Sequence, residues 1–236
     1  MAGQVVAEEV ARFDAMAAEW WDRDGPAREL HAMNPLRTRW VGERLAARHR
    51  GGVRLLDVGC GAGLAAEAFA RQGHAVTGLD AAAAAITAAR GHAQAEGLPI
   101  EYIAGTLESL PSAASFQAIT ALEVIEHVDD PGRFLQALAA RLEPGGVLFL
   151  STLNRTLRSY AMAILGAERL ARLVPRGTHT WRNFLTPAEL AGLARKAGLR
   201  IADSAGMRRD PLGGWHLSRD TGINYLLMAE SEPRAL

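Results

Sequence analysis

The sequence predicts an α/β fold, with a mostly parallel sheet of seven strands and helices on both faces of the sheet. Short apolar runs alternate with helical segments from residue 54 onward, and strands that are apolar along their whole length are typical of a parallel sheet covered on both sides. The first of these runs ends in a turn with three alternating glycines, and a helix follows at once. This order of strand, glycine turn and helix is typical of α/β proteins that bind nucleotide-like ligands.

Each predicted element follows from the apolar pattern and from the residues at its boundaries. Glu143–Gly146 predicts a turn before the fifth strand, and Thr186 is expected to cap a helix that starts at Pro187. The predicted strands span 54–58, 76–79, 100–104, 116–122, 147–152, 200–204 and 223–229, and the helices between them span 64–72, 81–96 and 131–142.

Two helices are expected before the first strand, over residues 5–21 and 34–50. Asn34 is a suitable N-cap for the second helix, and Pro35 suits its first helical position. Because both helices precede the sheet, residues 1–50 are predicted to form an N-terminal helical cap.

Residues 154–182 contain no strand pattern and predict one or two helices followed by a loop. An apolar helical face combines Leu157, Tyr160, Ala161 and Ile164, and arginines follow with helical spacing at Arg169, Arg172 and Arg176. The segment 154–185 is therefore predicted as a helical insertion or lid after the fifth strand, and residues 1–236 as one domain.

The composition favours a protein of a reducing compartment without a nucleic-acid partner. The chain balances 26 basic side chains against 26 acidic ones, so no net positive charge points to nucleic acid. The single cysteine, Cys60, excludes an internal disulfide and is given no catalytic role. Met1–Phe13 is charged, so no signal peptide is expected, and no apolar run is long enough to span a bilayer.

The glycine turn and an acidic residue predict a ligand that contains adenosine. The turn has the pattern G-x-G-x-G over Gly59, Gly61 and Gly63, whereas sites for pyrophosphate dinucleotides have G-x-G-x-x-G. The second strand ends in Asp80, and a carboxylate at that place can accept both hydroxyls of a ribose. The alternative is a helix-start turn with a surface aspartate. From Asp57 to Gly63, with Asp80, the pattern resembles the S-adenosylmethionine (SAM) site of class I methyltransferases, in which the turn meets the methionine part of SAM.

Glu123, Glu126 and His127 follow the fourth strand, at the edge of the sheet where the cofactor is expected. If the segment turns helically, the three side chains share one face. Two carboxylates and an imidazole suit Mg²⁺ or Zn²⁺. The alternative is a hydrogen-bonded pair of Glu126 and His127 that shapes the pocket without a metal.

Over most of its length the chain resembles the ubiquinone-biosynthesis O-methyltransferases. The matching stretches are Glu19–Asp22, Asn34–Arg37, Leu56–Gly63, Val76–Asp80, Glu123–His127, Pro144–Gly146, Ser151–Thr156, Gly166–Glu168, Val174–His179, Thr186–Leu190 and Ile223–Tyr225. The stretches outside the cofactor site are more specific than the glycine turn. Ala62, where the family often has a glycine, and the alanine run 81–85 are mild departures.

The resemblance implies a class I methyltransferase fold and a SAM-dependent enzyme. Its substrates would be a 2-polyprenyl-6-hydroxyphenol and a 3-demethylubiquinol, and other ubiquinone-biosynthesis proteins would be candidate partners. The family's cofactor contacts fall on Arg37, Gly59, Asp80 and Leu122, and its divalent metal falls on Glu123, Glu126 and His127. A bland alternative for Arg37 is a cation on a helix surface.

The chemistry requires that the acceptor hydroxyl lose its proton. A phenol with a pKa of about 10 is only roughly a thousandth ionised at pH 7, a deficit of about 4 kcal/mol. His127 could act as a general base, which is typically worth about 10²–10⁴-fold, or it could bind a metal that lowers the pKa of the phenol. Of these two roles we favour the metal ligand.

A long isoprenoid tail would make the substrate membrane-resident. The segment 154–176 is therefore expected to meet an anionic bilayer surface, with an ordinary lid whose arginines are solvated as the alternative. Trp20 and Trp21 are expected to pack in the cap, or else to wall a pocket for an apolar substrate. The loop residues His179, Trp181 and Phe184 could cover the pocket or pack for structural reasons. The predicted location is cytoplasmic, with peripheral attachment to the cytoplasmic face of the membrane.

Three other functions remain open at this point. The chain could be a SAM methyltransferase for another small acceptor, or a SAM-binding protein of a lipid surface without turnover. A nicotinamide oxidoreductase is third, and the glycine spacing disfavours it.

Overall fold

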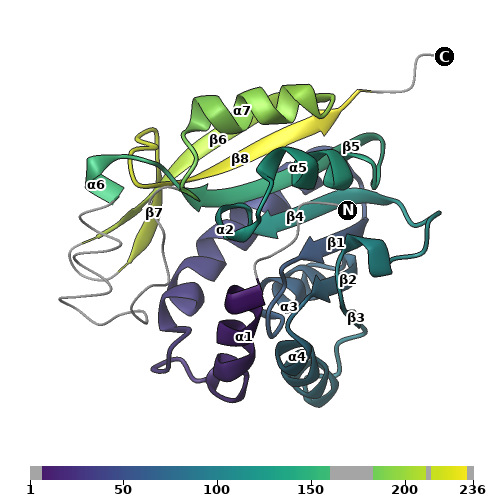
Figure 1. The fold of residues 1–236 in the computed structure, drawn as a ribbon. Coiled ribbons are helices and arrows are strands. Elements are labelled where there is room, and N and C mark those ends of the chain that lie inside the picture. Colours follow the sequence, from purple (N-terminus) through teal and green to yellow (C-terminus); the bar gives the residue numbers. More distant parts are fainter. Residues whose placement is uncertain (1–6, 160–182, 211–213, 233–236) are drawn as a thin grey trace.

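The computed structural model describes residues 7–159, 183–210 and 214–232, and within them the centre is one sheet of eight strands (Figure 1). The strand order is β3-β2-β1-β4-β5-β8-β6-β7. Strands β3 to β5 of this order are parallel, and β8, β6 and β7 pair antiparallel. The strands are β1 (Arg54–Val58), β2 (Ala75–Asp80), β3 (Glu101–Ala104), β4 (Phe116–Leu122), β5 (Leu142–Leu153), β6 (Leu199–Arg209), β7 (Trp215–Ser218) and β8 (Asn224–Ser231).

The predicted fold class is confirmed, whereas the predicted count of seven strands was wrong. The additional strand, β7, lies at the edge of the sheet and pairs only with β6 in the described structure. Its side chains are exposed or half-buried, so it lacks the apolar run by which the other strands were found. An edge strand of four residues leaves little sequence signal.

Strand β5 begins earlier than its apolar run. The predicted turn Glu143–Gly146 lies inside this strand, because pairing starts at Leu142 beside Phe116 and resumes at Val147 beside Ala118. Gly145 has φ +76°, a backbone conformation that glycine adopts without strain. The turn residues therefore form an irregularity within the strand rather than a boundary.

The helices match the predicted alternation, with shorter bounds. Thr186 caps α7 as predicted, because its hydroxyl accepts a hydrogen bond from the Glu189 N–H at 3.2 Å. The helices are α1 (Ala7–Met16), η1 (Ala17–Glu19), α2 (Arg28–Ala46), α3 (Leu64–Arg71), α4 (Ala83–Ala95), η2 (Leu107–Ser109), η3 (Ile125–His127), α5 (Pro131–Ala139), α6 (Leu157–Ser159) and α7 (Pro187–Lys196), where η marks a 3₁₀ helix.

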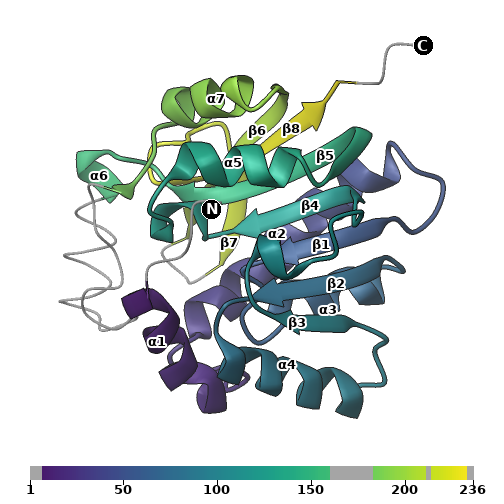
Figure 2. The same cartoon turned by 45° about the vertical axis from the view of Figure 1, so that its right-hand side comes forward.

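Two layers of helices cover the two faces of the sheet. Neighbouring residues of a strand point to opposite faces, so Leu56 packs in the cluster that contains α5 and α7, while Leu55 packs in the cluster that contains α2, α3 and α4. Figures 1 and 2 show α5 and α7 on one side of the sheet and α2 and α3 on the other. Full burial of one leucine side chain contributes about 1.5–3 kcal/mol, so these clusters hold the layers on the sheet.

The N-terminal cap differs from the prediction in both of its helices. The first helix ends at Met16 and continues as a 3₁₀ turn to Glu19, and residues 5 and 6 lie outside the described chain. The second helix begins at Arg28, so the prediction of Asn34 as its N-cap was wrong and Pro35 lies inside the helix.

Two hydrogen bonds are formed next to Pro35, which itself lacks an N–H donor. The Thr38 hydroxyl donates to the Asn34 carbonyl at 2.8 Å, and the Asn34 side-chain amide donates to the Leu64 carbonyl at 2.8 Å. The second bond joins α2 to the first turn of α3, so Asn34 fixes the cap on the sheet instead of starting a helix.

Most of the predicted insertion lies outside the described residues. Tyr160, Ala161, Ile164, the three arginines, His179 and Trp181 belong to residues 160–182, and only the ends of the segment can be placed. Leu157 in α6 is 80% exposed, and Phe184 is buried against Leu153. Phe184 therefore packs as part of the protein interior, in agreement with the structural alternative.

None of the helices in the described ranges combines the length and the apolar character needed to cross a membrane.

Candidate functional site

The glycine turn between β1 and α3 has a backbone that only glycine adopts easily. Gly59, Gly61 and Gly63 have φ values of +69°, +55° and +92°, which cost other residues about 1–2 kcal/mol each. A Cβ on Gly61 would lie 2.4 Å from Cζ2 of Trp20, and a Cβ on Gly59 would lie 2.3 Å from Cγ2 of Val124. The turn therefore needs glycine for its backbone and also for the side chains packed against it.

Asp80 meets this turn at the tip of the neighbouring strand. Val58 and Leu79 are paired in the parallel register of β1 and β2. The Gly61 N–H donates to Oδ2 of Asp80 at 2.8 Å, and the Ala82 N–H donates to Oδ1 at 2.8 Å. Burial raises the pKa of Asp80 above its ordinary value. The structure thus brings the predicted acid and the predicted turn into direct contact.

Two buried side chains of opposite charge, Arg37 and Asp57, influence each other electrostatically. Arg37 of α2 is only 3% exposed, so the alternative of a surface cation was wrong. Asp57 is also buried, and its Oδ1 accepts a hydrogen bond from the Thr120 hydroxyl at 2.6 Å. Burial raises the pKa of Asp57 to about 7, while the Thr120 hydroxyl and the charge of Arg37 lower it.

Both members of this pair keep unused hydrogen-bonding atoms. Nε and Nη1 of Arg37 and Oδ2 of Asp57 are buried without a hydrogen-bond partner among the described residues. Burial lowers the pKa of Arg37, and the charges of Glu123, Asp57 and Glu126 oppose that effect. Buried orphan donors cost about 1–3 kcal/mol each, so these atoms are suited to a polar ligand that completes them.

The segment after β4 does not begin as a helical turn, so the condition for one shared helical face is not met at Glu123. Glu123 has φ +59°, a left-handed conformation that is unusual for a residue with a side chain. Its Oε1 accepts a hydrogen bond from the Ser151 hydroxyl at 2.7 Å. A 3₁₀ helix then covers Ile125–His127. Such strain is frequent at functional sites, where the surrounding structure holds it.

Glu126 and His127 point to different surroundings. Glu126 is buried, accepts a hydrogen bond from the Thr152 hydroxyl at 2.9 Å and leaves Oε1 without a partner in the described structure. Burial, followed by the charge of Glu123, raises the pKa of Glu126 to about 7. His127 meets Phe13 of the cap edge to face, with ring centroids 5.9 Å apart.

These residues do not fit the predicted divalent metal as they are placed. Among the described residues, no group of three or more histidine, cysteine, aspartate or glutamate side chains could hold a metal ion. Glu123 turns to Ser151 and Glu126 turns to Thr152, so their carboxylates bind separate hydroxyls of β5. The metal prediction is therefore not supported by this arrangement.

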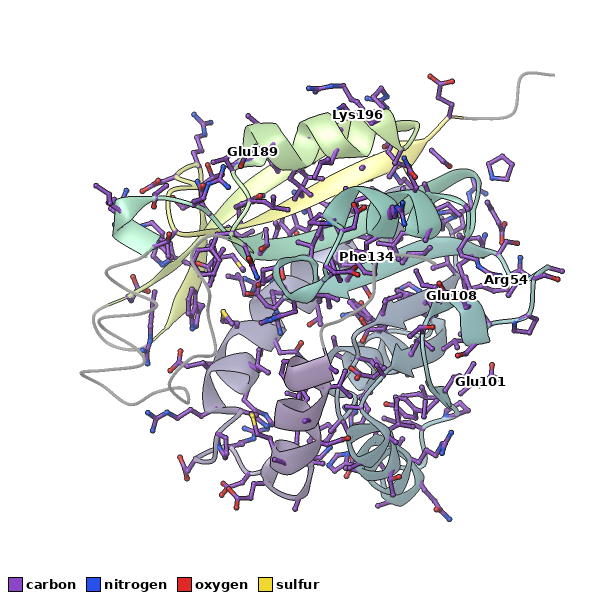
Figure 3. The ribbon with its side chains drawn as sticks, viewed as in Figure 1. Arg54, Glu101, Glu108, Phe134, Glu189 and Lys196 are labelled. Atoms are coloured by element: carbon purple, nitrogen blue, oxygen red, sulfur yellow. The ribbon has the colours of Figure 1, made fainter. Side chains whose placement is uncertain are left out.

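A cavity at the carboxyl ends of β1, β2 and β4 connects the glycine turn and Asp80, here called the cofactor side, with the segment after β4, here called the acceptor side. Leu122, Glu123 and His127 line it together with Gly59, Gly61 and Asp80. The predicted site residues Arg37, Asp57, Gly63 and Glu126 are not among its lining residues. Two other lining residues, Phe134 of α5 and Glu108 of η2, are visible in Figure 3. The remaining lining residues are Val10, Phe13, Trp20, Leu30, Val58, Leu79, Ala81, Gly105, Thr106, Leu107 and Val124.

Besides Phe134 of α5, two groups of lining residues were missed by the sequence prediction. The first, Gly105–Glu108, follows β3 at the same sheet edge, and its position after a strand was an available signal. The second comes from the cap: Val10, Phe13 and Leu30. The sequence predicted the cap and offered its paired tryptophans as pocket walls, but it did not single out these three apolar residues.

Of the two roles proposed for the paired tryptophans, one residue lines the pocket and the other packs in the cap. Trp20 is buried, lines the cavity and contacts Gly61. Trp21 packs outside the cavity, and its indole N–H donates to the Ala62 carbonyl of the glycine turn at 3.1 Å. Trp20 thus walls the pocket while Trp21 attaches the cap to the turn.

Comparison with known proteins gives consistent matches. Residues 30–204 match the model of a methyltransferase domain family. A Methylobacterium nodulans protein named ubiquinone biosynthesis O-methyltransferase is 45% identical over 235 residues, which are 94% of this chain and 94% of that protein. A protein of the same name from Xanthomonas axonopodis pv. citri is 46% identical over 227 residues, covering 94% and 92%.

Solved structures share the fold at low sequence identity. Magnesium protoporphyrin IX methyltransferase from Synechocystis, with bound SAM, has a TM-score of 0.64 and 19% identity over 96% of this chain and 98% of its own. A SAM-dependent methyltransferase from Clostridium acetobutylicum has a TM-score of 0.63 and 11% identity over 94% and 98%.

Proposed function

Because this chain belongs to the ubiquinone biosynthesis O-methyltransferase family, we propose that it methylates catechol-type hydroxyls of polyprenylated ubiquinone precursors at both O-methylation steps, with SAM as the methyl donor. The observation that carries the proposal is the shared cavity, which is lined by the glycine turn, by Asp80 and by the segment Glu123–His127. A methyl donor and an acceptor held in one cavity can be aligned while water is excluded.

The cofactor side would bind SAM through groups of complementary charge. Asp80 would accept the ribose hydroxyls, since a carboxylate oxygen that already accepts one backbone N–H keeps a further lone pair. Nε and Nη1 of Arg37, which have no partner among the described residues, would bind the carboxylate of the methionine part. Gly59, Gly61 and Gly63 would let the backbone approach that part closely, and Leu122 would pack against the cofactor.

The acceptor side would remove the proton of the hydroxyl group. We assign the role of general base to His127, which lines the cavity from η3. A base of this kind is worth about 10²–10⁴-fold, which meets most of the deficit of about 4 kcal/mol for a phenol at pH 7. Glu123, whose Oε1 binds Ser151, also lines the cavity and would orient the second hydroxyl of a catechol.

The apolar side chains that line the cavity favour an acceptor molecule with an apolar part. Phe13, Leu30 and Phe134 line the same cavity as His127. They would exclude water from the reacting atoms, which strengthens the electrostatic interactions inside. An aromatic ring with a prenyl substituent fits such walls better than a charged acceptor does.

The divalent metal is retained as a separate prediction. Glu123, Glu126 and His127 lie in one short segment, and Glu126 Oε1 has no partner in the described chain. Metal binding would require their carboxylates to leave Ser151 and Thr152. Isothermal titration of the chelator-treated protein with Mg²⁺ and with Zn²⁺ tests this, with E123Q as the control. Metal binding to the wild type that is lost in E123Q would support the metal site. Equal heats of binding for both proteins would contradict it.

The expected membrane contact and the expected protein partners also remain proposals. Flotation with vesicles of anionic lipid would test the segment 154–176, with the three arginines at 169, 172 and 176 neutralised in a matched variant. Loss of flotation in that variant would support an electrostatic contact. Co-purification with other ubiquinone-biosynthesis proteins would test the partners.

Mass spectrometry of the product tests the proposed reaction directly. A demethylubiquinol with a short prenyl chain is incubated with the protein and SAM, and a mass increase of one methyl group on oxygen is expected. Parallel incubations replace the demethylubiquinol by a non-quinol catechol or by a 2-polyprenyl-6-hydroxyphenol. Methylation of the small catechol alone would favour another acceptor, and SAM binding without any methyl transfer would contradict the proposed enzyme.

A further inference from the structure

An aromatic contact outside the cavity attaches the N-terminal cap to α4. The ring of Trp21 lies parallel to the ring of His92, with a centroid distance of 3.4 Å and an angle of 1° between the planes. His92 lies in the last turn of α4, whereas Trp21 follows η1 in the cap. Stacking of an imidazole on an indole face combines apolar contact with attraction to the ring electrons.

A buried carboxylate holds the His92 ring in this position. Oε1 of Glu67 lies 2.7 Å from Nδ1 of His92, and Oε2 accepts a hydrogen bond from Arg71 at 2.9 Å. The side chain of Glu67 is completely buried. Since an ionised carboxylate only accepts hydrogen bonds, Nδ1 is the donor. The ring plane of His92 is thus fixed by α3 before Trp21 stacks on it.

The same tryptophan reaches the cofactor side of the molecule. Its indole N–H donates to the carbonyl of Ala62, between Gly61 and Gly63. The preceding residue, Trp20, lies on Gly61 and lines the cavity. A shift of Trp21 would therefore move a cavity wall and break the hydrogen bond from its indole to the Ala62 carbonyl of the glycine turn.

A second contact holds the cap at the other end of α4. Oδ1 of Asp14 accepts the Ala84 N–H at 2.8 Å. This amide belongs to the first turn of α4, where backbone donors lack partners within the helix and negative charge is favourable. The cap thus spans α4 from its first turn to its last, and Figure 2 shows α1 beside α4.

We propose that His92 is a positioning residue which, through its stack on Trp21, seats the cap on the glycine turn and thereby sets the affinity and the residence time of the cofactor. The proposal rests on the proposed SAM site but needs no assumption about the acceptor. His92 does not line the cavity, so its effect on the cofactor would pass through Trp21 and Trp20.

The test compares three variants by binding of S-adenosylhomocysteine (SAH), the demethylated cofactor. H92A removes the stack, while Arg71 still pairs with Glu67. H92F keeps a planar ring and removes only the contact with Glu67. H216A is the matched control, because His216 of β7 pairs with Asp210 and does not line the cavity. Calorimetry gives the Kd, stopped-flow fluorescence gives the dissociation rate, and urea unfolding confirms that each variant is folded.

We expect H92A to raise the Kd of SAH and the KM of SAM about tenfold, mainly through faster dissociation, with kcat changed less than twofold. H92F should recover the Kd to within threefold of the wild type, and H216A should match the wild type. If H92A unfolds, W21L removes the same stack from the side of the cap.

Wild-type affinity and dissociation in H92A, or a defect in H92F as large as in H92A, would overturn the proposal. These measurements use SAH alone, so a failure to methylate any quinol would contradict the proposed acceptor without affecting them. A wild-type protein that does not bind SAH would instead contradict the proposed function.

Discussion

The two sides of the cavity differ in how their backbone is held, although buried polar atoms on both sides lack a partner among the described residues: Nε and Nη1 of Arg37 on the cofactor side and Oε1 of Glu126 on the acceptor side. On the cofactor side, backbone N–H groups already bind both oxygens of Asp80, and three glycines hold the turn. On the acceptor side, Glu123 has a strained backbone and Glu126 keeps an oxygen without a partner in the described structure. The difference indicates that the cofactor side is preformed, whereas the acceptor side is held ready by the structure around it.

The largest effect should come from the acceptor side. Replacing His127 by alanine removes the proposed base, so kcat should fall about 10²–10⁴-fold. SAH affinity should change less than twofold, because the glycine turn and Asp80 are unaltered. Steady-state kinetics and calorimetry on the same preparation measure both quantities. A large loss of SAH affinity in H127A would show that His127 also contributes to cofactor binding, so the two sides would not act separately.

The next effect should come from the glycine turn. In G61A a methyl group would lie close to Trp20, and the residue would have to keep φ +55°. We expect SAM affinity to fall about 100-fold, because strain and steric overlap together cost about 3 kcal/mol. G192A is the control: Gly192 lies in α7 with open space around it, so alanine should be tolerated there. Wild-type affinity in G61A would show that the cofactor lies elsewhere.

A smaller effect is expected for the buried arginine. R37A removes donors that would bind a charged ligand group, and such bonds are worth about 1.5–3 kcal/mol, or roughly 10–100-fold in affinity. Arg39 is exposed on the same helix, so R39A should leave SAM affinity unchanged. Calorimetric titration of both variants measures the difference. Equal affinities would assign Arg37 to stability alone.

The smallest effect concerns the pH dependence of stability. The pKa of Glu126 is raised from 4.5 to about 7 in the folded protein, so between these values the folded state keeps a proton that the unfolded state releases. Stability from this group is therefore full below about pH 4.5 and falls as the pH rises to about 7. E126Q, which stays neutral, should lose less stability across that range, by on the order of 1 kcal/mol for each pH unit.

Urea unfolding of the wild type and of E126Q at pH 5 and at pH 8 measures this difference. Relative to the wild type, E126Q should have a higher free energy of unfolding at pH 8 than at pH 5. The same loss of stability in both proteins would show that Glu126 is ionised in the fold and that its carboxylate is better satisfied than the unpartnered Oε1 indicates.

The parts predicted well from the sequence are those in which a local pattern determines structure. The strand before Gly59 and the strand that ends at Asp80 were placed by their apolar runs, and parallel pairing brings their tips together. The burial of Arg37 could not be predicted, because it depends on how α2 packs on the sheet. The helix start at Arg28 was missed because Pro35 is a strong local signal for a helix start, and tertiary hydrogen bonds outweighed it.

On the acceptor side, the local sequence pattern did not predict the arrangement of the side chains. The spacing of Glu123, Glu126 and His127 suggested one helical face, but the left-handed backbone at Glu123 turns its side chain toward Ser151. Helical spacing predicts a common face only where the backbone is helical. The approach of Phe13 to His127 joins residues from the cap and from η3, and no local pattern encodes such a contact.

A structure with bound SAH would test the central claim most directly. The account predicts that the adenosine lies between Asp80 and the residues after β3, with the sulfur beside Gly61 and the open side of the sulfur facing His127. A sulfur that faces away from Glu123 and His127, or SAH bound outside this cavity, would contradict it.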